Sequence, residues 1–193
     1  MFTDMTWLNE PPSWRVEDDG SLTVVTADGK DFWRHTHYGF VHDDGHFLYT
    51  EVSGDFVLQA TFNGDYGKQY DQAGLMLRAD EENWIKTGTE FVGGGLNVSS
   101  VVTRGHSDWS VVSLPRRGGA FPDLTIRVIR TGEAVNVQYL DGWGTWRLLR
   151  LAHLPLGETC LAGVMCCSPE REGFRAVFRD LSISSDVPED EHT

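Results

Sequence analysis

The feature that most constrains the fold is a succession of short apolar runs separated by glycine and aspartate. In the run 56–62, Phe56, Leu58, Ala60 and Phe62 share one side of an extended chain, and the residues between them share the other. No window of eleven or more residues keeps the apolar period of an amphipathic helix. The sequence therefore predicts strands, which we place at 21–27, 46–52, 55–62, 73–78, 84–91, 96–104, 109–114, 124–130, 134–139, 145–151, 160–167 and 174–183.

Short turns between these runs predict antiparallel sheets that pack face to face. Asp141-Gly142 and Asp44-Gly45 are both typical of hairpin turns. A chain of 193 residues, 40% of them hydrophobic, is large enough for one buried core. We predict an all-β, antiparallel two-sheet β-sandwich, with a single domain over 1–185 and an acidic, disordered tail at 186–193.

The charge of the chain excludes several partners. The formal net charge is −13, and no run of Lys or Arg reverses it locally, so we expect no binding to nucleic acid or to a membrane surface. The N-terminus lacks a basic segment followed by an apolar one, and the sequence therefore predicts a cytoplasmic protein. Cys160, Cys166 and Cys167 are odd in number and partly adjacent, which indicates buried free thiols on opposite faces of a strand.

Several motifs together carry a family resemblance. They are the segments 31–40 (DFWRHTHYGF), 54–56 (GDF), 70–78 (YDQAGLMLR), 84–91 (WIKTGTEF), 101–104 with 108–110, and 141–146. With these motifs the chain resembles, over nearly its whole length, a family of unknown function that includes the fungal "regulation of enolase" protein. The resemblance implies a concanavalin A-like lectin/glucanase jelly roll, whose concave sheet often binds glycans. It implies no enzymatic reaction, and it hints at a regulatory partner.

Two neighbouring strands carry a polar face. If Ala73, Leu75 and Leu77 face the core, then Gln72 and Arg78 lie on the opposite face. By the same alternation Trp84, Lys86 and Glu90 share one face of the next strand. An indole ring and a set of polar groups suit a sugar or another small polar ligand. The alternative is a cross-strand ion pair on the solvated side of a sandwich.

A histidine-rich segment adds further candidates. Trp33, His35 and His37 alternate so that they point the same way on an expected strand. Two histidines at this spacing are either part of a metal site or part of the polar groove, and we favour the groove because no third ligand is evident. The predicted ligand-binding residues are therefore Trp33, His35, His37, Gln72, Trp84, Lys86, Glu90 and Trp109, with no metal and no cofactor.

Motifs for catalysis are missing from the sequence. Glu90 stands alone on its strand, and no nucleophile elbow, P-loop or dinucleotide fingerprint occurs. We therefore assign no catalytic residue and favour a non-catalytic protein that binds a carbohydrate or a carbohydrate-like metabolite, with a possible regulatory role. The first alternative is a module that interacts with a metabolic enzyme. The second is a glycoside hydrolase that uses Glu90.

Overall fold

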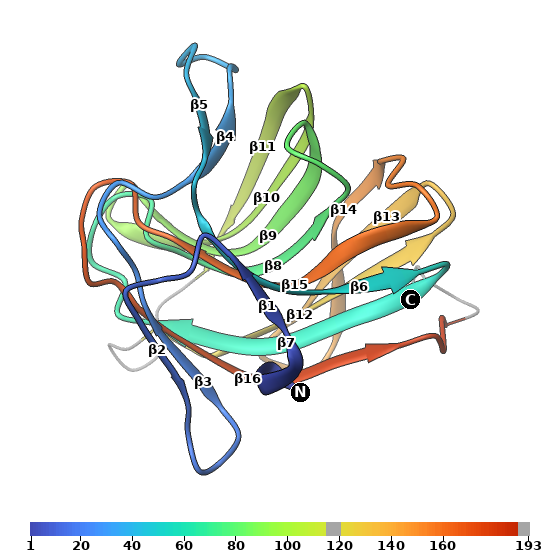
Figure 1. Ribbon diagram of the computed structural model, residues 1–193, viewed down its shortest axis with the longest axis horizontal. Helices are drawn as coiled ribbons and strands as arrows, with labels where there is room; N and C mark the ends of the chain where they lie inside the picture. Colours follow the sequence, from blue (N-terminus) through green and yellow to red (C-terminus); the bar gives the residue numbers. More distant parts are fainter. Residues whose placement is uncertain (115–120, 189–193) are drawn as a thin grey trace.

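The structure is a computed structural model that describes residues 1–114 and 121–188. Residues 189–193 of the expected acidic tail lie outside that part. All strand pairings among the described residues are antiparallel, and they form two seven-stranded sheets and one small hairpin (Figure 1). The expected two-sheet sandwich is confirmed.

The first sheet, called sheet I here, lies under the candidate site. Its strands, in spatial order, are β1 (Thr6–Leu8), β6 (His46–Ser53), β15 (Thr159–Cys167), β8 (Gln72–Arg78), β9 (Asn83–Val92), β10 (Gly95–Arg104) and β11 (His106–Ser113). Sheet II consists of β14 (Trp146–His153), β13 (Ala134–Leu140), β12 (Leu124–Thr131), β7 (Phe56–Gly64), β16 (Arg175–Ser184), β3 (Leu22–Val25) and β2 (Ser13–Val16). A 3-10 turn, η1 (Phe2–Asp4), precedes them, and no helix among the described residues is long and apolar enough to cross a membrane.

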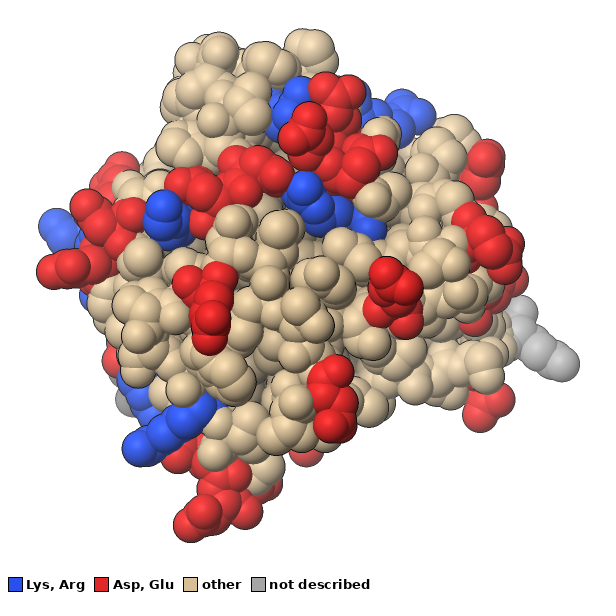
Figure 2. Space-filling model, viewed as in Figure 1, with Lys and Arg blue, Asp and Glu red and all other residues tan. Residues whose placement is uncertain are grey.

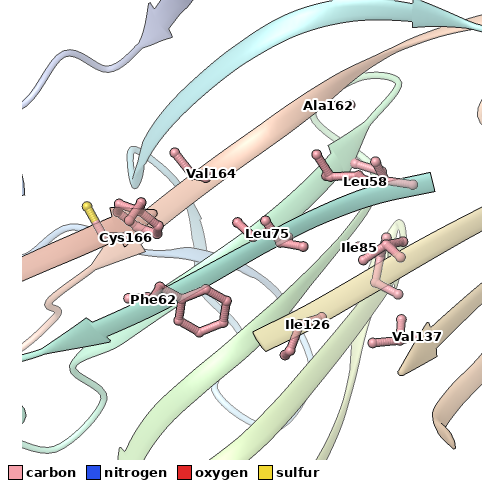
Figure 3. Close-up of a cluster of buried hydrophobic side chains, with 14 of the residues drawn as sticks. Leu58, Phe62, Leu75, Ile85, Ile126, Val137, Ala162, Val164 and Cys166 are labelled. Atoms are coloured by element: carbon pink, nitrogen blue, oxygen red, sulfur yellow. The ribbon is translucent and has the colours of Figure 1, made fainter. Parts of the chain in front are cut away.

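The main core lies between the two sheets. Leu75 and Ile85 of sheet I meet Phe62 and Ile126 of sheet II, and all four side chains are almost completely buried (Figure 3). Strand β7 buries every second residue from Phe56, as its alternation predicts. Burial of each such large apolar side chain contributes about 1.5–3 kcal/mol, which is why the alternating pattern is strong enough to fix the register of both sheets.

A second apolar cluster lies on the outer face of sheet I. Cys166 belongs to the main core while Cys167 belongs to this second cluster, so the two thiols face opposite ways, as predicted. The second cluster is covered by the hairpin β4 (Phe32–Arg34) and β5 (Val41–Asp43). Figure 1 shows this hairpin rising beside β11 and over sheet I. The buried members of the second cluster are Phe32, Trp33, Phe47, Met76, Trp84, Val101, Met165 and Cys167.

Two local expectations are wrong. Asp44-Gly45 makes no hairpin; it carries the chain from β5 of the small hairpin to β6 of sheet I. The segment from Trp33 to His37 is not one strand, because β4 ends at Arg34 and both His35 (φ 58°) and His37 (φ 65°) adopt left-handed backbone conformations. Histidine is among the residues enriched in that region, so a run that alternates like a strand bends here into the tip of a hairpin.

Candidate functional site

The candidate site is a cleft of about 290 Å³ between sheet I and the β4–β5 hairpin. Gln72, Lys86, Glu90 and Val101 form its floor, and each comes from β8, β9 or β10. Trp109 of β11 closes one side. The remaining lining comes from the hairpin and from two loops, namely Asp31, Trp33, Tyr38, Phe40, His42, Tyr70, Pro169 and Glu170.

A pair of glycines lowers the floor of this cleft. Gly74 of β8 and Gly88 of β9 lie directly opposite each other. The cross-strand pair Gln72–Glu90 flanks them on one side, and the pair Met76–Lys86 flanks them on the other. A Cβ atom built on Gly88 would come within 2.7 Å of the Gly74 Cα and still closer to a backbone carbonyl oxygen. The two strands therefore approach each other more closely than any side chain permits. No side chain rises from the middle of the floor.

Ion pairs hold the hairpin on sheet I. Asp31, next to β4, pairs with Lys86 at 2.7 Å, and Asp43 of β5 accepts two hydrogen bonds from the guanidinium of Arg78, one of them 2.9 Å long. A carboxylate and a guanidinium that meet through two parallel bonds also fix their relative orientation. The hairpin is thus positioned by the polar groups of β8 and β9 that the alternation assigned to this face.

Aromatic packing secures the same hairpin from below. Phe32 lies 6.1 Å from Trp84, measured between ring centroids. Phe32 fits because Gly45 has no side chain; a Cβ there would collide with the Phe32 ring and would lie 2.8 Å from the Cys167 sulfur. The backbone amide of Arg34 donates to the Ser107 hydroxyl at 2.9 Å and so ties β4 to β11.

Two oppositely charged side chains are buried in the floor. Lys86 and Glu90 are 3% and 5% exposed, and one Glu90 oxygen accepts a hydrogen bond from the Trp109 indole at 2.9 Å. Burial raises the pKa of Glu90, although the nearby Lys86 charge opposes this effect. For Lys86 burial acts to lower the pKa, but the carboxylates of Asp31 and Glu90 together outweigh it and the pKa is raised. Lys86 therefore stays charged.

The wall opposite the floor consists of exposed aromatic rings. Tyr38 and Phe40 are 47% and 43% exposed, and their rings stack at 5.2 Å with an angle of 12° between the planes. Trp33 packs edge-on against Tyr38, and the Tyr38 hydroxyl lies 3.2 Å from that of Tyr70. The rings of Trp33, Tyr38 and Phe40 line the cleft, next to the charged groups of its floor.

The structure brings together five of the eight predicted site residues. Trp33, Gln72, Lys86, Glu90 and Trp109 all line the cleft. The other three predicted residues, Trp84, His35 and His37, do not line it.

The Trp84 ring is fully buried under the hairpin, so the expectation that a ligand stacks on it is wrong. His35 packs against His106 at 5.1 Å, and His37 borders a neighbouring hollow with Ser107 and Asp108, because the backbone turns at both histidines. The described residues contain no group of three or more His, Cys, Asp or Glu side chains that could hold a metal ion.

Several lining residues were missed from the sequence. Asp31, Tyr38, Phe40 and Tyr70 lie outside the strands of sheet I, so the alternation of those strands carried no information about them. Two features of the sequence indicate a turn at the tip of the hairpin: Gly39, and the aromatic residues Tyr38 and Phe40 on either side of it. Asp31 also adds a second carboxylate to the cleft beside Glu90, which no single strand pattern revealed.

The fold and the cleft together define the class of protein. It is an antiparallel β-sandwich with an aromatic-lined cleft on one sheet, and the sandwich fold is shared with a carbohydrate-binding module. The module CBM66 from Bacillus subtilis superposes with a TM-score of 0.61 over 94% of this chain and 98% of its own, at 16% sequence identity, which shows a common fold. Within this class the chain belongs to a family of proteins of unknown function (DUF1349), whose model matches residues 7–186.

A sequence match and a structural match both come from baker's yeast, Saccharomyces cerevisiae. "Regulation of enolase protein 1" is 40% identical over 180 residues, which span 93% of this chain and 89% of the yeast protein. A crystal structure of a functionally unknown yeast protein matches with a TM-score of 0.87 and 39% identity, over 97% of this chain and 98% of the other. The family resemblance inferred from the motifs is confirmed.

Proposed function

We propose that the protein is a non-catalytic binding protein whose cleft takes a carbohydrate or a carbohydrate-like polyol. The observation that carries this proposal is the meeting of the exposed aromatic rings of Tyr38 and Phe40 with the buried charges of Lys86 and Glu90 in one cleft. A sugar ring presents both matching surfaces at once, because its faces carry C–H groups and its edges carry hydroxyl groups. The likeness in fold to a module named for carbohydrate binding supports the same proposal.

The size and rigidity of the cleft fit a short ligand. A volume of about 290 Å³ suits one or two sugar units rather than a long polymer buried along its length. Lys86 and Glu90 are held by Asp31 and by the Trp109 indole, so their hydrogen-bonding atoms are already oriented before a ligand arrives. Prior orientation lowers the entropic cost of binding.

Titration of a panel of mono- and oligosaccharides, followed by calorimetry and tryptophan fluorescence, tests this proposal. Phe40→Ala removes an exposed ring from the cleft wall, and we expect a loss of affinity of up to about tenfold, since a ring contact contributes roughly 0.5–1.5 kcal/mol. Val41→Ala is the matched control, because Val41 is exposed on the same hairpin but does not line the cleft. Its affinity should stay within about twofold of the parent.

Three outcomes would overturn the proposal. They are failure of every sugar in the panel to bind, equal losses in Phe40→Ala and Val41→Ala, and turnover of a chromogenic glycoside. If turnover occurs and is abolished by Glu90→Gln, the protein is a glycoside hydrolase. The buried, protonatable carboxylate of Glu90 would then be its acid.

A protein partner is the second candidate. The tip of the hairpin exposes Tyr38, Phe40 and Val41 side by side, and a relative with 40% identity is named for regulation of enolase. Exposed apolar groups of this kind are typical of protein contacts. Binding to purified enolase, measured by biolayer interferometry, should then be lost in Val41→Asp and kept in Glu90→Gln. No binding, or equal binding by both variants, would reject this candidate.

A further inference from the structure

The carboxylates of the cleft outnumber its strong cations. Asp31, Glu90 and Glu170 line the cleft, and Lys86 is the only Lys or Arg among the described residues that does so. The ammonium of Lys86 lies 2.7 Å from Asp31. Glu90 forms no ion pair within the described part of the chain. The hydrogen bond that it accepts from the Trp109 indole comes from a neutral donor. The floor of the cleft therefore holds one buried carboxylate without a cation of its own.

We propose that the ligand of this cleft carries an ammonium group, and that it is an amino sugar with a free amine that pairs with Glu90. This inference rests on the proposed carbohydrate function and narrows it to one class of sugar. The ammonium would lie on the carboxylate of Glu90, and the rings of Trp109, Trp33 and Tyr38 would surround it.

The energy of a buried charge favours this assignment. A carboxylate removed from water without a counter-charge is costly, and the cost is relieved either by a proton or by a cation. Burial raises the pKa of Glu90, which favours the proton when no cation is present. An ammonium from the ligand relieves the same cost, and it also gains from nearby aromatic faces, which attract cations.

The same charges exclude acidic ligands. A uronic acid or a sugar phosphate would need a cation, but Lys86 already shares its charge with Asp31 and lies beside Glu90. Glu170 adds a further exposed carboxylate at the rim. A neutral sugar would be tolerated, since it brings no charge into conflict with the floor, but it would leave Glu90 and Asp31 to share the single positive charge of Lys86.

Binding of such a ligand is linked to pH. An ammonium ligand displaces the proton from Glu90, so affinity should rise as the pH increases through the raised pKa of Glu90. Lys86 stays charged and is paired with Asp31, so the ionisation of Glu90 is the change to which the ligand responds. The titratable groups that line the cleft together with Glu90 are Asp31, Tyr38, His42, Tyr70, Lys86 and Glu170.

Calorimetric titration with two disaccharides that share one carbohydrate backbone tests the inference. The first is the free-amine dimer of glucosamine, and the second is its fully N-acetylated form, in which neutral acetamide groups replace the amines. We expect the free amine to bind at least about tenfold more tightly at pH 7, an advantage of about 1.4 kcal/mol, and to lose this preference progressively as the pH is lowered and Glu90 becomes protonated. Glu90→Gln should reduce the preference to about twofold at every pH. Glu170→Gln, which removes an exposed carboxylate of the same cleft, should reduce it much less.

Each other result has a definite meaning. Equal binding of the two disaccharides overturns the inference and leaves the carbohydrate function intact. Binding of neither, when the wider panel also fails, overturns both. A preference for the amine that survives in Glu90→Gln removes Glu90 from the site, and a pH dependence that survives in that variant does not come from Glu90. Near-UV circular dichroism checks that Glu90→Gln is folded.

Discussion

At the scale of single residues, the structure is unusual in burying charges on the outer face of a sheet. Lys86 and Glu90 are as buried as core side chains, yet they lie outside the core between the sheets. Strand alternation predicted their face correctly. It could not predict their burial, because the cover comes from a hairpin about fifty residues earlier in the chain, as in the contact between Asp31 and Lys86, which are separated by 55 positions.

Glu90 should lower the stability of the folded protein at neutral pH. Its folded-state pKa is raised by burial, so the protonated form favours folding. The contribution is fully present below the unfolded pKa, near 4.3, and is lost as the pH rises through the folded pKa. We expect Glu90→Gln to be more stable than the parent at pH 7.5 in urea unfolding, and the difference to disappear near pH 4.

The control for this effect is Glu51→Gln, because Glu51 is an exposed residue of β6 in the same sheet. Its unfolding free energy should equal that of the parent at both pH values. A Glu90→Gln protein that is less stable than the parent at pH 7.5 would mean that the hydrogen bond from Trp109 and the charge of Lys86 stabilise ionised Glu90 more than burial penalises it.

At the scale of elements, the hairpin turns an ordinary sandwich face into a cleft. Three residues at its tip, His35, His37 and Gly39, have positive φ. The left-handed backbone conformation of each histidine costs roughly 1–2 kcal/mol relative to a β-region conformation. Contacts at the base offset this cost, chiefly the ion pairs of Asp31 and Asp43 with sheet I. Strained backbone held in place by such contacts is typical of functional segments.

Sequence patterns predicted the large elements and missed the small ones for a physical reason. Every strand expected from the alternation of apolar residues forms, because each has at least one face in a core. The short strands β1, β2 and β5 carry too few alternating residues to give a signal. The β4 segment was misjudged because alternation continues through His35 and His37, where only the backbone conformation differs. Trp84 was placed on the correct face, but its cover by Phe32 depends on tertiary contacts.

The close approach of β8 and β9 gives a prediction at this scale. Gly88→Ala places a methyl group 2.7 Å from the Gly74 Cα, so the two strands must separate and the floor of the cleft must rise. We expect a loss of about 3 kcal/mol or more in urea unfolding, at the upper end of what overpacking costs. Sugar affinity measured on the folded variant should fall as well.

Gly95→Ala is the matched control on the adjoining strand β10. A Cβ there has no neighbour nearer than 3.9 Å, and Gly95 does not have a positive φ. Its stability should stay within about 0.5 kcal/mol of the parent. Equal stability of the two variants would show that β8 and β9 can separate without cost, and the glycine pair would then have no part in shaping the floor.

At the scale of the whole molecule, the excess of negative charge acts on every element at once. The net charge is −13, and Figure 2 shows acidic side chains spread over most of the visible face with fewer basic ones between them. The end of the β4–β5 hairpin stands out on this face as a region without charged side chains. An excess of acidic side chains around an aromatic projection suits attraction of a cationic ligand over a distance, in keeping with the charge of the cleft.

This charge also makes the stability of the protein depend on salt. Mutual repulsion of like charges disfavours the compact state, and the range of this repulsion shrinks from about 30 Å at 0.01 M to about 8 Å at 0.15 M ionic strength. The surface ion pairs weaken with salt too, but exposed pairs contribute only about 0–1 kcal/mol each. We therefore expect Tm to rise by about 2–4 °C between 10 and 200 mM NaCl, the shift produced by about 1 kcal/mol in a chain of this size.

A variant with reduced charge separates repulsion from other effects of salt. Glu51 and Glu81 are both exposed, and neither forms an ion pair within the described residues. Glu51→Lys combined with Glu81→Lys changes the net charge from −13 to −9, because each exchange adds two positive charges. Differential scanning fluorimetry should then show a smaller rise of Tm with NaCl in the variant than in the parent. If Tm falls with salt in the parent, the attraction within the ion pairs outweighs the repulsion across the whole surface.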